Sequence, residues 1–137
     1  MSNKTATAKI NLSYKSASGA SVVWPEFSVG APYQGANVAT IDVPDTATED
    51  TEFDVPFGSI ESASLVLIVN RLGQDILAHI NPGEDTNPTH TIAPGGSFLH
   101  AGSTVGGTPI SAMKLVLTAN QTEPGLLECL VFGDPIA

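Results

Sequence analysis

The sequence predicts an all-β fold, an antiparallel β-sandwich of the jelly-roll type with about eight to ten short strands. Three observations support this. Apolar and polar residues alternate with a period of two in several segments, which is typical of half-buried strands. Turn signals recur about every 8–12 residues, as in sandwiches and barrels. The 13 glycines and 10 prolines suit a fold with many tight turns better than a helical one.

The N-terminal third contains three predicted strands. Residues 8–15 alternate apolar and polar side chains, which predicts a strand with one face in water; Gly19 ends it. Residues 22–29 form a second strand, which we expect at an edge or with a bulge because Pro25 lacks a backbone donor. Residues 38–43 form the third. Shorter extended segments are predicted at 53–57, 90–92 and 97–100.

The middle and the end of the chain supply the predicted core. Residues 65–69 are apolar on both faces, as expected for a strand that is covered on both sides. A four-residue turn follows, and 74–80 is predicted to return as the hairpin partner. Residues 113–119 alternate, and 127–132 is predicted to pair back with them across the turn at Pro124-Gly125.

The length of 137 residues is typical of one domain. Ser2 to Thr7 has little apolar surface to bury. We therefore predict a flexible N-terminal arm at residues 1–7 and a single sandwich domain at residues 8–137.

The charge of the chain restricts its partners. The formal net charge is −9, from 14 acidic and 5 basic residues, with no basic stripe. Nucleic acid and anionic membranes are therefore not expected as partners. The longest strongly apolar run, Leu65 to Val69, is far too short to span a membrane, and no apolar signal segment follows the N-terminal lysines. We expect synthesis in the cytoplasm of a host cell.

No enzyme template fits the sequence, so we predict no catalytic residue and no cofactor. Gly-x-Ser-x-Gly and phosphate-binding glycine loops do not occur, and Ser97 is interpreted as a serine between a turn and a strand. A glycosidase pair of carboxylates stays open, because such pairs meet only in space. Cys129 lies in an apolar run and is predicted to be a buried thiol.

Two groups of residues raise the question of a metal, and in both cases we favour the structural interpretation. His79, His90 and His100 could converge on a transition metal, but their spacing matches no established site. Six carboxylates lie between positions 42 and 54, at a density that could hold calcium, yet no glycine makes the central turn of an EF-hand. The six are Asp42, Asp45, Glu49, Asp50, Glu52 and Asp54.

Four segments of the chain resemble small β-sandwich proteins of tailed bacteriophages that bind the capsid exterior as cement or decoration proteins. These are Phe57-Gly58, Leu65 to Asn70 with Gly73-Gln74-Asp75, Pro94 to Phe98, and Glu128 to Asp134. The resemblance implies a jelly-roll-like fold, a homotrimer at local three-fold axes, and the major capsid protein as partner. It implies a virion location and no catalysis.

Four residues are candidates for an interface. Lys4 and Lys9 lie where the arm could reach along a neighbouring subunit. Trp24 and Tyr33, together with Tyr14, could form an aromatic binding face, although packing in the core is the favoured use of such side chains. An exposed aromatic face would suit the alternative function, a carbohydrate-binding module or the receptor-binding domain of a fibre.

Overall fold

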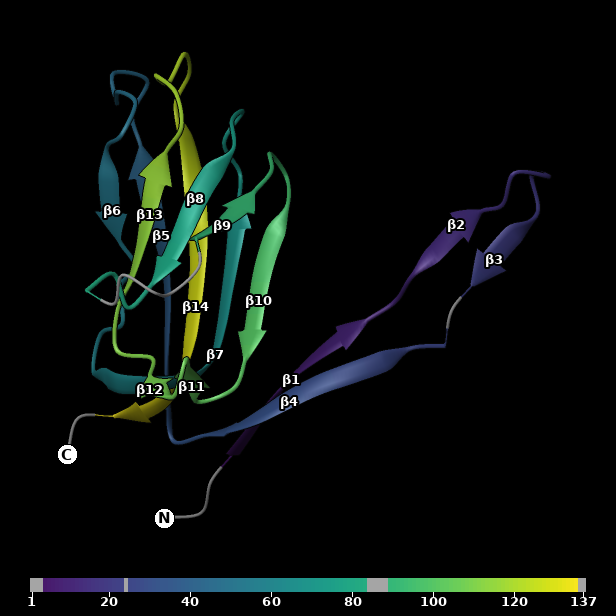
Figure 1. Cartoon of the computed structure of the whole chain (residues 1–137), viewed down its shortest axis with the longest axis horizontal. Helices are drawn as coiled ribbons and strands as arrows, with labels where there is room; N and C mark the ends of the chain where they lie inside the picture. Colours follow the sequence, from purple (N-terminus) through teal and green to yellow (C-terminus); the bar gives the residue numbers. More distant parts are fainter. Residues whose placement is uncertain (1–3, 24, 84–88, 136–137) are drawn as a thin grey trace.

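Two antiparallel four-stranded sheets pack face to face in the computed structural model, which describes residues 4–23, 25–83 and 89–135 (Figure 1). The first sheet has the order β10-β7-β14-β5, formed by Ser97–Ala101, Ile60–Asn70, Gly125–Pro135 and Gly35–Val43. The second has the order β6-β13-β8-β9, formed by Glu52–Asp54, Met113–Leu117, Ile76–Ile80 and Thr89–Ile92. The predicted all-β sandwich is confirmed.

The connectivity of these eight strands is that of a jelly roll. Numbered along the chain, the strands have the order one, eight, three, six in the first sheet and two, seven, four, five in the second. Among chain neighbours, only β8 and β9 lie in the same sheet. Each remaining connection crosses between the sheets, which is how a jelly roll closes around one core.

Both predicted central hairpins are wrong. Strand β7 pairs with β10 and β14, whereas β8 pairs with β13 and β9, so the two segments lie in opposite sheets. Likewise β13 and β14 lie in opposite sheets. The physical reason is burial: β7, β8, β13 and β14 each have an apolar face, and these faces are covered when the two sheets pack together.

A long two-stranded ribbon precedes the sandwich. Strand β1 (Lys4–Ile10) pairs with β4 (Phe27–Tyr33) over seven residues, and β2 (Ser13–Lys15) pairs with β3 (Ser21–Val23) further out. The ribbon leaves one end of the sandwich and extends away from it (Figure 1). We name it the N-terminal ribbon, residues 4–33.

The boundary of the arm differs from the predicted one. Residues 4–7 belong to strand β1, and the sandwich strands begin only at Gly35. The alternation in residues 8–15 therefore reflects the two faces of a protruding ribbon. Pro25 lies between β3 and β4, outside both strands. Residues 1–3 lie outside the described part of the chain.

A short hairpin, β11 (Thr104–Val105) with β12 (Thr108–Pro109), completes the described strands. Its turn is Gly106-Gly107, with φ of 59° and 82°, a conformation that suits glycine at both positions. No helix in the described ranges is long and apolar enough to cross a membrane.

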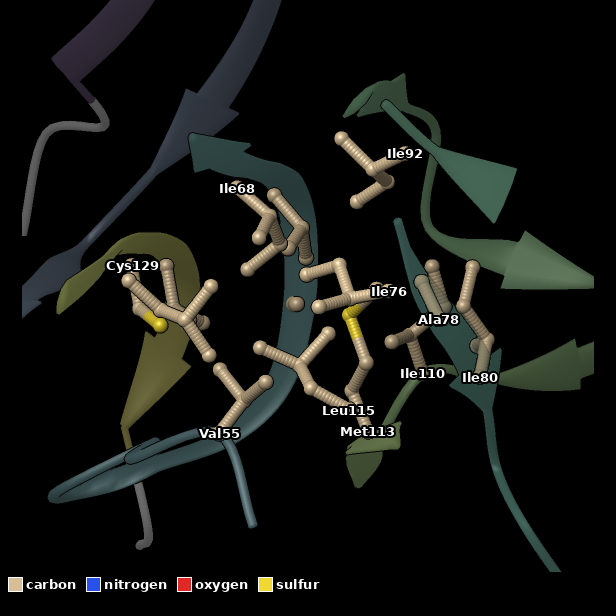
Figure 2. Close-up of a cluster of buried hydrophobic side chains, with 14 of the residues drawn as sticks. Val55, Ile68, Ile76, Ala78, Ile80, Ile92, Ile110, Met113, Leu115 and Cys129 are labelled. Atoms are coloured by element: carbon tan, nitrogen blue, oxygen red, sulfur yellow. The ribbon is translucent and has the colours of Figure 1, made fainter. Parts of the chain in front are cut away.

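The core lies between the two sheets and takes side chains from both. Ile68 of β7 and Cys129 of β14 face Ile76, Met113 and Leu115 of the second sheet (Figure 2). Each of these five side chains has 1% or less of its surface exposed. Burial of this apolar surface is the main stabilising contribution to the sandwich.

Cys129 is fully buried, as predicted, and burial raises the pKa of its thiol from 9.0 to about 11. The unfolded chain therefore loses this proton at lower pH than the folded protein. We expect the free energy of unfolding to fall as the pH rises between these two values. Urea unfolding of the wild type and of Cys129→Ala at several pH values checks this, since the variant should lack this part of the alkaline decrease. Equal pH dependence in both proteins would contradict it.

Candidate interaction surfaces

The outer face of the first sheet is apolar. Leu99, Leu67, Leu130 and Val38 are register partners in turn across β10, β7, β14 and β5, so they form one row on the side away from the core. Leu65 and Phe132 are partners in the next row. Val38 is 70% exposed, and most of the others are half-buried. We name these six residues the outer apolar face.

A groove runs between this face and the first strand of the ribbon. It has a volume of about 240 Å³ and is lined by Ala6, Thr7 and Ala8 on one side. The opposite wall consists of five residues of the outer apolar face: Leu65, Leu67, Leu99, Leu130 and Phe132. The lining offers almost no hydrogen-bonding side chains, which suits an apolar occupant.

The ribbon is attached to the sandwich at its root. The Ser64 hydroxyl donates a hydrogen bond of 2.6 Å to the carbonyl of Pro32. The backbone N–H of Gln34 donates to the carbonyl of Gly133 at 3.0 Å. The Tyr33 ring packs edge-on against Phe132, with 5.1 Å between the ring centres. These contacts fix the point at which the ribbon leaves the sandwich.

The structure places three of the four predicted interface residues on the ribbon, where Lys4 and Tyr33 are neighbours and Lys9 lies apart from them. Lys4 is exposed at the root, where its register partner is Tyr33. Lys9 is exposed further out, beside Ser28. Because residues 4 and 9 are separated by an odd number of positions, the two lysines lie on opposite faces of the ribbon. Trp24 lies outside the described residues.

Apolar side chains gather on the outer part of the ribbon. Leu12 is 52% exposed, Tyr14 49% and Val23 75%. These residues belong to the distal ribbon, which we define as Leu12 together with strands β2 and β3. Sequence reasoning treated Tyr14 as a member of an aromatic face with Tyr33, but Tyr33 is engaged by Phe132 at the root.

Charge is divided unequally between the ribbon and the sandwich. Three of the five basic residues, but only one of the 14 acidic residues, lie between positions 4 and 33. This segment therefore has a formal charge of +2, and the remainder of the chain has −11. Opposite charges on two parts of one surface favour contacts between copies.

The three histidines do not converge. His90 pairs with Ala78, whose side chain faces the core, so the adjacent His79 lies on the opposite face of the same sheet. His100 belongs to the other sheet. His90 packs against Phe98 with 4.9 Å between ring centres, whereas the Nε2 atoms of His79 and His100 are buried without a hydrogen-bond partner among the described residues. This arrangement does not support one metal site.

The acidic side chains between positions 42 and 54 are exposed, and backbone hydrogen bonds hold this segment against the sandwich. The Glu49 N–H donates to Asn120 Oδ1 at 2.8 Å, and the Asp50 N–H donates to the Leu117 carbonyl at 3.0 Å. Lys114 Nζ lies 3.1 Å from Glu52, whose hydrogen bond and charge raise the pKa of the lysine. In the part of the chain that the structure describes, no three His, Cys, Asp or Glu residues are grouped to hold an ion.

No protein-family model matches the chain, and no curated protein is a significant match to it. The surfaces of the protein and the resemblance of its four short segments are therefore the indications of its function.

The outer apolar face is the feature that sequence reasoning missed. The sequence predicts that the run Leu65 to Val69 is covered on both sides. In the structure only one side of β7 meets the core, and on the outer side Leu65 is buried whereas Leu67 and Val69 are half-buried. The sequence signal for this face is an apolar run on a strand of a predicted sandwich. Such a run predicts an outer face that needs a partner.

Proposed function

We propose that the chain is a structural protein of a tailed phage particle, a cement or decoration subunit that binds the outer capsid surface and catalyses no reaction. The observation that carries the proposal is the outer apolar face beside a protruding ribbon of opposite charge to the sandwich. Such surfaces serve adhesion between proteins. The resemblance of four segments to phage decoration proteins is the reason for proposing a phage particle as the site of this adhesion.

The jelly roll suits this role because it is a rigid scaffold that carries an apolar surface on the outer face of one sheet. We propose the major capsid protein as the partner and a homotrimer as the bound form. The acidic sandwich disfavours nucleic acid and anionic membranes. Lys4 and Lys9 remain proposed contact residues on the ribbon. Tyr33 holds the ribbon root, so an aromatic glycan platform gains no support from it.

Binding to emptied capsids of the virus that encodes the chain tests the proposal. The full chain should sediment with the capsids at a fixed number of copies per capsid and should raise the temperature at which they break open. Bovine serum albumin at the same concentration serves as the protein control. Failure to sediment at saturating concentration would overturn the capsid role. Binding to glycans in the same preparation would favour the carbohydrate-binding alternative.

A further inference from the structure

Within the described residues, the large hydrophobic side chains that are clearly exposed lie in two places. Leu12, Tyr14 and Val23 belong to the distal ribbon, and Val38 belongs to the outer apolar face. Exposed apolar side chains gathered in this way mark surfaces that are covered by a partner. The two places are separate within one copy, because the ribbon extends away from the sandwich (Figure 1).

Isolated two-stranded ribbons have marginal stability in water. Among the described residues, β2 and β3 form a two-stranded sheet of their own, with no further strand paired to either. Val23 and Lys15 lie on one face of this pairing and Tyr14 and Val22 on the other, because Ser13 pairs with Val23 and Lys15 with Ser21. A third layer under the first face would cover Val23, which is 75% exposed. The outer apolar face offers such a layer.

The charges favour a second copy of the chain over an unrelated partner. Lys15 lies on β2, in the segment of charge +2. On the first sheet, Asp42 and Glu128 lie on the same side as Val38 and Leu130, at the border of the apolar rows. Glu128 already forms an ion pair with Arg71 at 3.0 Å. Asp42 on β5 is exposed and is therefore the acidic group that a lysine of a second copy could approach.

We propose that the distal ribbon of one copy docks on the outer apolar face of a second copy. Val23 of the docked ribbon covers Val38 and Leu130, and Lys15, on the same face of the ribbon, approaches Asp42. Each copy donates one ribbon and offers one face, so the contact is heterologous, and the proposal includes its closure into a ring. The inference deepens the proposed function, on which its biological setting rests, because a ring of three copies would be the unit that binds the capsid.

The mass in solution is the first measurement. Light scattering behind a sizing column should give a ring at micromolar concentrations, with about 42 kDa for three copies of 14.1 kDa. Val23→Glu and Val38→Glu each add a carboxylate to one side of the contact. Because both positions are exposed, the sandwich should remain folded, as circular dichroism checks. Each variant should raise the dissociation constant of the ring more than about tenfold.

The matched control is Thr91→Glu, which adds the same carboxylate to an exposed position of β9 in the other sheet. It should leave the mass unchanged. A carbodiimide, which joins a lysine amine to a carboxylate as an amide with loss of water, should link Lys15 to Asp42. In a mixture of ¹⁴N- and ¹⁵N-labelled chains, this link should join labelled to unlabelled copies.

Three outcomes would overturn the inference: a monomer at every concentration, a ring that both glutamate variants leave intact, or Lys15–Asp42 links only within one copy. Capsid binding is measured separately, so the two proposals fail in different ways. Intact rings that do not bind capsids would refute the capsid role alone. Capsid binding by a chain that forms no ring would refute the docking alone.

Discussion

Gly133→Ala is expected to lower the free energy of unfolding by about 3 kcal/mol or more. Gly133 is buried in β14, where the pairing with β7 shifts its register. A Cβ at this position would overlap the backbone carbonyl oxygen of Ser62 and lie 2.8 Å from the Cα of Ala63. Both obstacles are backbone atoms of the neighbouring strand, so relief requires the two central strands of the first sheet to separate.

Urea unfolding monitored by circular dichroism measures the effect as a shift of the midpoint. Gly73→Ala is the control, because its nearest atom would be the flexible Glu123 carboxylate at 3.5 Å. That variant should stay within about 0.5 kcal/mol of the wild type. Equal stability of Gly133→Ala and the wild type would show that the strands accept the methyl group. Because the Gln34 N–H at the ribbon root donates to the Gly133 carbonyl, the ribbon root would then also be able to move.

The fold class was predictable because its signals are local. Alternation at period two and frequent turn residues arise within single segments. Each alternating segment contains a strand in the structure. Strand pairing is not local. The sequences of β7 and β8 are equally compatible with a hairpin in one sheet and with a connection that passes from one sheet to the other. Packing across the core decides between them, and no short segment records that packing.

The ribbon shows the same limit. Ala6, Ala8 and Ile10 alternate with polar residues, a pattern that is identical whether the apolar face meets the core or a partner. Sequence reasoning therefore assigned this segment to the sandwich from residue 8 onward. It therefore placed Lys4 in the predicted arm and Lys9 at the start of the predicted sandwich, whereas the structure has both on strand β1. It did not find the outer apolar face, because full burial on both sides and partial cover on the outer side give the same apolar run.

Asn70 lies where the chain crosses between the sheets and bonds the backbone there. Its side chain is fully buried, which requires hydrogen bonds to the amide. The amide nitrogen donates to the carbonyls of Gln74 at 2.8 Å and Ile92 at 2.9 Å, and Oδ1 accepts from the Leu72 N–H at 2.9 Å. One residue thus holds the β7–β8 crossing and the end of β9 in place.

The backbone of Asn70 extends this role to a second crossing. Its N–H donates to the Gly96 carbonyl at 2.9 Å, and its carbonyl accepts from the Gly95 N–H at 2.8 Å. Gly95 and Gly96 form the connection from β9 to β10, which also passes between the sheets. Both crossings at this end of the jelly roll therefore depend on the position of one residue.

We expect Asn70→Ala to lower the free energy of unfolding by about 3 kcal/mol, because three backbone groups lose their partner in a buried site. Asn120→Ala is the control, since the hydrogen bond that its Oδ1 accepts from the Glu49 N–H is exposed, and its loss should cost less than about 1 kcal/mol. Thermal unfolding of both variants measures the difference, and hydrogen exchange at Leu72 should accelerate in Asn70→Ala alone. If the two substitutions cost the same, the crossings are held by core packing, and the buried amide is a consequence of the jelly roll rather than one of its causes.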